Sequence, residues 1–70
     1  MNCLELKTAI MKANKTYRSI ARSLGISEQA FYNKVQGITE FKNSEIKKIA
    51  SILHLSLAEV NFIFFDCEVN

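Results

Sequence analysis

The sequence predicts an all-α fold in which five short helices form a single domain over residues 1–70. Two segments carry apolar residues at the spacing i, i+3, i+4 and i+7, which places them on one face of a helix. Proline is absent, and two glycines stand where helices are expected to end. The hydrophobic fraction of 49% is that of a folded chain, although 70 residues are near the lower limit for a core without metal or disulfides.

Charge and composition restrict the classes of function. The formal net charge of +2 and the pI of about 8.7 permit nucleic-acid binding without requiring it. The longest apolar patch, residues 61–65, is far too short to span a bilayer, and the N-terminus lacks a signal-peptide pattern, so we expect a cytoplasmic protein without a membrane partner. Cys3 and Cys67 have no CxxC spacing and His54 is far from both, so we expect free thiols, no metal and no cofactor. Because no nucleophile has a partner base, we expect no enzyme.

The first two helices are expected before Gly25. Residues 4–13 form the first, and its apolar face consists of Leu6, Ala9, Ile10 and Ala13. Thr16 follows a polar break and can cap a second helix that runs through residue 24. The apolar stripe of this second helix consists of Ile20, Ala21 and Leu24.

A turn and a third helix follow. Gly25 stands where a left-handed residue ends a helix, because glycine has no Cβ that opposes a positive φ. Ile26 is expected to plug the turn, and Ser27 to cap the third helix over residues 28–36, which Gly37 then stops. Phe31 and Val35 point inward, and the stem of Lys34 is expected over the edge of the core with its ammonium group in water. The outward face carries Glu28, Gln29, Tyr32, Asn33 and Gln36.

Two more helices complete the fold. Phe41, in the loop over residues 38–42, is expected to fold back on the core, and a fourth helix over residues 43–53 has the apolar stripe Ile46, Ile49, Ala50 and Leu53. Ser56 and Glu59 match a capping box, so a short fifth helix should reach about Phe64. The C-terminal tail, residues 65–70, has no helical pattern and is expected to be extended or frayed.

Four consecutive large apolar residues close the predicted fifth helix, namely Phe62, Ile63, Phe64 and Phe65. They cannot all face one side of a short helix. Two rings can finish the core, and the others are candidates for contact with a protein. Three explanations stay open: burial within the monomer, contact in a homodimer and contact with a different protein such as a larger repressor.

The spacing of Ala21, Gly25, Ile26, Ser27 and Gly37 resembles the helix-turn-helix of the lambda Cro and phage-repressor family, also called the XRE family. The resemblance covers nearly the whole chain and is strongest to small phage members from Gram-positive hosts. It implies a five-helix, lambda-repressor-like domain with the motif at about residues 16–37. Ala21 should be small because the two helices cross closely, and Gly25 supplies the bend, so a larger residue at either position is expected to splay the pair.

The resemblance also implies a function, which is sequence-specific DNA binding by a transcriptional regulator that occupies an operator in a genetic switch. Base-edge contacts would come from Glu28, Gln29, Tyr32, Asn33 and Gln36. Phosphate contacts would come from Lys15, Thr16, Arg18, Ser27, Thr39 and Lys42. A polar face is also what any solvent-exposed helix carries. The partners expected are double-stranded DNA and, in addition, a second copy of the chain or a partner repressor.

Three residues depart from the family pattern. Phe31 stands where Ile, Val or Leu is more usual, which predicts an enlarged core. Arg18 lies near a position where many members place a phosphate-clamping Gln. Glu28 suits the helix dipole by about 0.3 to 1 kcal/mol but opposes a phosphate. Because of Glu28, the small net charge and the apolar tail, an antirepressor that binds a partner repressor instead of DNA remains an alternative.

Overall fold

The computed structural model describes residues 1–65, and these residues form α-helices without any strand. The helices are α1 (Cys3–Lys12), α2 (Tyr17–Leu24), α3 (Glu28–Val35), α4 (Asn43–Ile52) and α5 (Leu57–Phe64). The predicted all-α class with five helices is therefore confirmed for this part of the chain. The tail predicted to be extended or frayed lies, apart from Phe65, outside the described residues.

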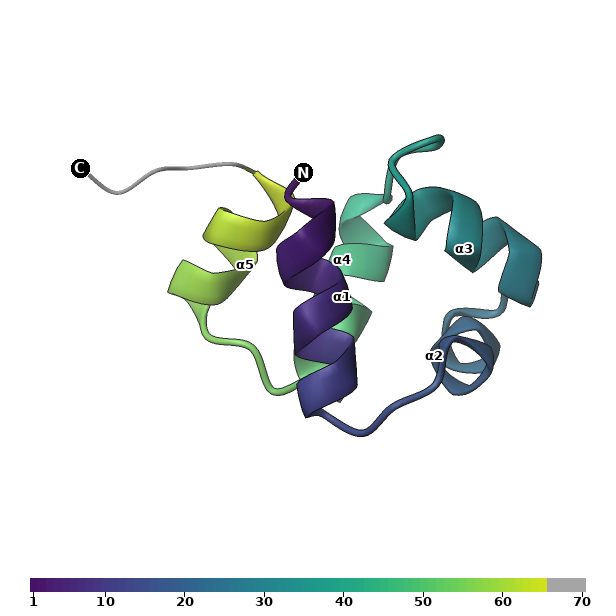
Figure 1. The fold of residues 1–70 in the computed structure, drawn as a ribbon, viewed down its shortest axis with the longest axis horizontal. Helices are drawn as coiled ribbons and strands as arrows, with labels where there is room; N and C mark the ends of the chain where they lie inside the picture. The colour runs from purple at the N-terminus through teal and green to yellow at the C-terminus, as the bar shows by residue number, and fades with distance from the viewer. Residues whose placement is uncertain (66–70) are drawn as a thin grey trace.

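The helices pack as a bundle with α1 at its centre. In Figure 1, α1 stands in front of α4, with α5 on one side and α2 and α3 on the other. Accordingly α1 contacts both α3 and α5, while α4 contacts both α2 and α5. None of the helices among residues 1–65 is both long enough and apolar enough to cross a lipid bilayer.

Side-chain caps explain where four of the helices begin. The oxygen atoms of Asn2, Thr16, Ser27 and Ser56 each accept from the backbone N–H three residues later, at 3.0 to 3.2 Å. These caps satisfy N–H groups that have no partner within the helix. The caps predicted at Thr16, Ser27 and Ser56 are thus confirmed. α4 begins differently, because its N-cap is Lys42, whose side chain has no acceptor.

Within residues 1–65, left-handed residues follow four of the five helices, and two of them are Gly25 and Gly37, which were predicted to end α2 and α3 and have φ of 73° and 81°. Asn14 and His54 adopt the same conformation after α1 and α4, with φ of 59° and 54°. One expectation about Gly25 is wrong: a Cβ atom there would meet nothing within 4 Å, so a larger residue would not push the helices apart. The turn leaves open space at this point, and Gly25 is required for its backbone conformation alone.

The core follows the predicted stripes closely. Its largest fully buried side chains are Leu6, Ile20, Phe31, Val35 and Ile49. Ile10, Ala21, Leu24, Ile46 and Leu53 are also buried, whereas Ala9, Ala13 and Ala50 are partly buried. Every helix except α5 therefore contributes an apolar face at the positions that the sequence periodicity predicts.

A row of aromatic rings passes through this core. Phe31 is completely buried, and its ring meets the rings of Tyr17 and Phe41 edge to face, with centroids 5.4 and 6.0 Å apart. Phe41 in turn meets Phe64 at 5.5 Å. The predicted return of Phe41 to the core is confirmed. These contacts explain why phenylalanine stands at position 31. A branched aliphatic residue could not make edge-to-face contacts with both α2 and the segment after α3.

The apolar run at the end of α5 is divided between inside and outside. Ile63 and Phe64 are 3% and 8% exposed, whereas Phe62 and Phe65 are 45% and 50% exposed. The expectation that Ile63 and Phe64 are candidates for a protein interface is therefore wrong, because the helical period turns both toward the core. Only one ring of the run, that of Phe64, completes the core. Phe62 and Phe65 remain candidates for a contact with a protein.

Candidate nucleic-acid interface

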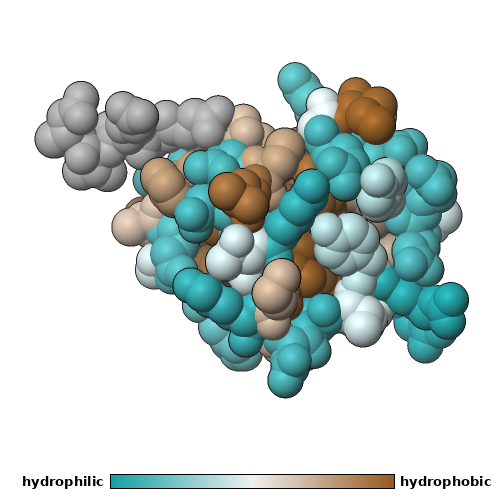
Figure 2. All heavy atoms as spheres, viewed as in Figure 1, coloured by the Kyte–Doolittle hydropathy of each residue, from teal (hydrophilic) through white to brown (hydrophobic). Residues whose placement is uncertain are grey.

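The outward face of α3 is positioned by the two residues beneath it. Phe31 and Val35 are fully buried and fix the rotation of the helix about its axis. Gln29 is consequently exposed, and Tyr32 is 44% exposed. Figure 2 shows that the surface over α2 and α3 is mostly hydrophilic, while hydrophobic and hydrophilic residues alternate over α1 and α5.

Two amides on this face act as a unit. The Nε2 group of Gln29 donates to Oδ1 of Asn33 at 3.1 Å, one helical turn later. The pair presents the carbonyl oxygen of Gln29 and the amide nitrogen of Asn33, which are one acceptor and one donor. This is the pattern that a single Asn or Gln offers to the N6 and N7 edge of adenine. The hydrogen bond also reduces the rotamer freedom that would be lost on binding.

Gln36, the last residue assigned to base contact, has a different environment. It is only partly exposed, and its Oε1 atom accepts from the ammonium group of Lys7 on α1 at 3.1 Å. The C-terminal end of α3 is thereby tied to α1. The amide nitrogen of Gln36 is the group that would contact a base.

Glu28 and Arg18 form an exposed ion pair between the first turns of α3 and α2. The Nε atom of Arg18 donates to Oε1 of Glu28 at 3.4 Å, and the two side chains are 78% and 54% exposed. The structure thus joins a residue assigned to base contact with one assigned to a phosphate. Because both ends lie in water, the pair stabilises the fold by at most about 1 kcal/mol. Either side chain can turn to another partner at small cost.

A shallow hollow of about 270 Å³ lies beside this ion pair, between α2 and α3. It is lined by Tyr17, Glu28, Gln29 and Tyr32. Burial raises the pKa of the Tyr17 hydroxyl above 10.0, and the nearby Tyr32 adds to the effect. Tyr17 therefore keeps its proton at neutral pH and can donate a hydrogen bond into the hollow. Sequence reasoning missed Tyr17, although its place directly after the cap Thr16 was a usable signal.

The side chains assigned to phosphate contacts flank α3 at both ends. All of them are exposed, namely Lys15, Thr16, Arg18, Ser27, Thr39 and Lys42. The first three surround the start of α2, and Thr39 and Lys42 lie in the segment between α3 and α4. Thr16 and Ser27 use their hydroxyl oxygens to cap helices, which leaves the hydroxyl hydrogens as donors for a phosphate.

The prediction that the ammonium group of Lys34 lies in water is wrong. Its side chain is only 13% exposed, and Nζ lies 3.3 Å from Oε1 of Glu45, which is itself buried. Burial alone would raise the pKa of Glu45, but hydrogen bonds from the Lys42 backbone and from Lys34 hold that pKa below its ordinary value of 4.5. The pair forms because the first turn of α4 lies within reach of the long Lys34 side chain, and no local sequence pattern signals it.

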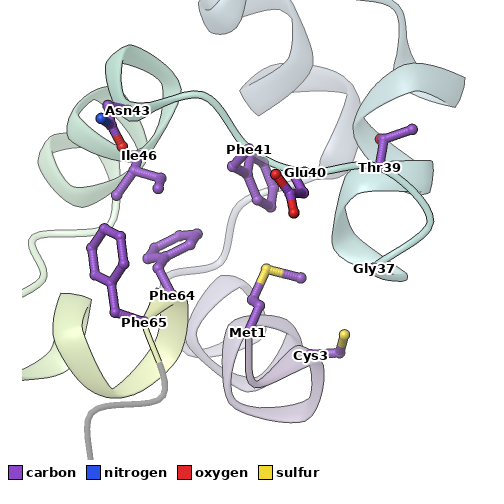
Figure 3. A pocket seen from close by; sticks show the side chains of 10 residues that line it. All are labelled: Met1, Cys3, Gly37, Thr39, Glu40, Phe41, Asn43, Ile46, Phe64 and Phe65. Atoms are coloured by element: carbon purple, nitrogen blue, oxygen red, sulfur yellow. The ribbon is translucent and has the colours of Figure 1, made fainter.

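A larger hollow, of about 480 Å³, lies on another side of the molecule. Figure 3 shows that the start of α1, the segment after α3 and the end of α5 surround it, with Met1, Phe41 and Phe64 around its interior. Thr39 is on its rim, and Asn43, Ile46 and Phe65 lie at the opposite side. The hollow therefore adjoins the segment that carries two of the assigned phosphate contacts.

Comparisons of this chain with protein-family models, with curated proteins and with solved structures find no match. Within residues 1–65 no group of three or more His, Cys, Asp or Glu side chains is placed to hold a metal ion. Cys3 is partly buried beside Gly37, and Cys67 lies outside the described residues. The exposed surface of α3 carries amide, phenol and carboxylate side chains, and hydroxyl and basic side chains flank it.

Proposed function

We propose that this chain is a sequence-specific DNA-binding transcriptional regulator of the lambda Cro and phage-repressor type, and that α2, the Gly25–Ser27 turn and α3 form its helix-turn-helix. The observation that carries the proposal is the outward face of α3. Its amide and phenol side chains stand above the buried Phe31 and Val35, and basic and hydroxyl groups flank them at both ends. A major groove about 12 Å wide accepts a helix with such a face.

Base reading is assigned to the middle of α3. The coupled amides of Gln29 and Asn33 suit the edge of an adenine, and Tyr32 can pack against the methyl group of a thymine. Phosphates on one side of the groove would meet Lys15, Thr16 and Arg18, and those on the other side would meet Thr39 and Lys42. This division, with base contacts between two sets of backbone contacts, fixes a helix in one register on the duplex.

Regulation would follow from occupancy of the operator in the host cytosol, where a bound protein blocks polymerase. A two-fold dimer would place two copies of α3 about 34 Å apart on successive turns of the groove. Phe62 on α5 and Phe65 directly after it, both about half exposed, are the apolar residues proposed for contact between the two copies. The operator would then be a pseudo-palindrome.

The alternative is an antirepressor that binds a partner repressor. The ion pair between Arg18 and Glu28 favours it, because Glu28 neutralises a cation that would otherwise face a phosphate. The exposed rings of Phe62 and Phe65 are compatible with this alternative as well.

Selection from a library of random duplexes tests the proposal. The proposal predicts enrichment of a short common site, followed by relaxed preference at one or two adjacent positions when Gln29 and Asn33 are both changed to Ala. Each lost base contact should cost about 1 to 3 kcal/mol on the preferred site. Enrichment of no site, together with a stable complex between the chain and a co-encoded repressor on a sizing column, would favour the antirepressor.

A further inference from the structure

One buried ammonium group holds together three parts of the chain. Nζ of Lys34, on α3, donates to the backbone oxygen of Glu40 at 2.9 Å and pairs with Glu45 in the first turn of α4 at 3.3 Å. It also lies 5.9 Å from the centre of the Phe41 ring. The segment between α3 and α4 therefore wraps around the end of the Lys34 side chain.

Glu45 completes the arrangement from the other side. The same Oε1 atom that faces Lys34 accepts from the backbone N–H of Lys42 at 2.8 Å. Lys42 is the N-cap of α4 and has no side-chain acceptor of its own, so Glu45 orients the residue at which the segment enters the helix. Through two side chains, α3 is connected to the backbone at residue 40 and at residue 42.

The segment also returns to α3 through its own backbone. The N–H groups of Ile38 and Thr39 donate to the carbonyl oxygen of Asn33, at 2.9 and 3.4 Å. Asn33 is assigned to base contact, and Thr39 and Lys42 are assigned to phosphates. The backbone bonds and the Lys34–Glu45 pair thus link residues of both assigned classes within one short part of the chain.

A buried ion pair is weak evidence for a role in stability, because apolar residues of similar volume often replace such a pair without loss. The parts of the chain that the pair orients are therefore the better guide to its role. We infer that Lys34 and Glu45 are positioning residues, which hold the segment over residues 38–42 in register with the outward face of α3. In this register α3 can contact the bases while the segment over residues 38–42 contacts the phosphates of the same duplex. This inference rests on the proposed function.

Three variants test the inference: Lys34→Met with Glu45→Leu, which removes the charges and retains bulk; Glu45→Gln, which retains the shape; and Lys34→Arg, which retains the charge. Lys48→Met is the matched control, because Lys48 is exposed on α4. Circular dichroism first establishes a temperature at which each protein is folded. Binding of the selected duplex and of a scrambled duplex is then titrated at several salt concentrations.

The double variant should lose about tenfold in its preference for the selected duplex, and the slope of log K against log salt should become shallower by about 0.9, the value of one phosphate contact. Lys34→Arg and the Lys48→Met control should leave preference and slope near those of the parent chain. Glu45→Gln should show the same losses as the double variant in smaller degree. A folded double variant with unchanged preference and slope would overturn the inference, and the Glu45→Gln result decides the question if the double variant does not fold.

Hydrogen exchange separates this inference from the proposed function, because it needs no DNA. If Lys34 and Glu45 position the segment, the amides of Ile38 and Thr39 should exchange at least tenfold faster in a folded double variant, with the amides of α2 unchanged. Equal exchange in the parent chain and the variant would refute the positioning role even if the chain binds DNA. Faster exchange in a chain that binds no DNA would leave the positioning of the segment standing and refute the proposed function.

Discussion

Substitution of Glu28 by Gln should strengthen DNA binding. Glu28 lies 3.4 Å from the guanidinium group of Arg18, and both side chains are more than half exposed. In water, charges at this separation attract each other by about 1 kcal/mol, which corresponds to about a fivefold change in an equilibrium constant. Removal of the carboxylate makes that energy available for contact with a phosphate. The free energy of unfolding should change by less than about 1 kcal/mol, because the pair is a surface pair.

Fluorescence anisotropy with a labelled duplex measures this effect at several salt concentrations. Glu28→Gln should raise affinity about fivefold at low salt, for selected and scrambled duplexes alike, and should steepen the slope of log K against log salt by about 0.9. Glu5→Gln is the matched control, because it removes the same charge from the groove between α1 and α5. The control should change the long-range attraction at low salt only slightly and leave the slope unchanged.

Two results would refute this account of Glu28. An unchanged affinity and slope would mean that Arg18 does not face a phosphate. Weaker binding of the selected duplex, with a changed preference at one position, would mean that Glu28 reads a base, as it would if its carboxylate accepted from the amine of a cytosine. In the second case the assignment of Glu28 to base contact would be retained.

Three further predictions concern stability. Phe31→Ala should reduce the free energy of unfolding by about 3 to 5 kcal/mol, and Phe31→Leu by about 1 to 3 kcal/mol through the loss of two edge-to-face contacts, as measured by urea denaturation. The pKa of Glu45 is below 4.5 in the folded chain, so its stabilising effect should be complete above that value and disappear as the pH falls through the lowered pKa. Acid titrations of the parent chain and of Glu45→Gln should therefore converge toward low pH, and a constant difference would contradict this reasoning. His54 and Gly25 have φ of 54° and 73°, a conformation that favours glycine. His54→Gly should therefore raise the free energy of unfolding by about 1 kcal/mol, and Gly25→Ala should lower it by about 1 kcal/mol. Thermal melts that show the opposite signs would refute both predictions.

Local patterns were enough to predict most of the helices. The stripe through Ile20 and Leu24, the caps at Thr16 and Ser27 and the left-handed Gly25 depend only on neighbours within a few residues. Such signals are fixed by the 3.6-residue period and by backbone conformation. The same patterns predicted the outward face of α3, because the side on which Phe31 and Val35 lie determines the side that faces water.

Contacts between distant residues could not be predicted in this way. The pairing of Lys34 with Glu45 depends on where the segment after α3 places the first turn of α4, and the pairing of Arg18 with Glu28 depends on how α2 and α3 cross. The last apolar run was expected to be divided, but which of its residues face the core could not be predicted, because its four large residues leave no polar position that would mark the outside of the helix. The open space around Gly25 depends on how the neighbouring helices pack, and so the sequence could not predict it either.

The dependence of DNA affinity on salt tests the central proposal most directly. Each copy carries Lys15 and Lys42 as exposed cations assigned to phosphates, while Glu28 engages Arg18. A single copy should therefore give a log-log slope of about −1.8 and a two-fold dimer about −3.6. The test is a titration of the unmodified chain against its selected duplex between about 50 and 200 mM salt, the range over which such contacts change affinity measurably. Saturable binding with a slope in that range is the predicted result. Absence of saturable binding at the lowest salt, or a slope near zero, would contradict the assignment of this chain as a DNA-binding regulator.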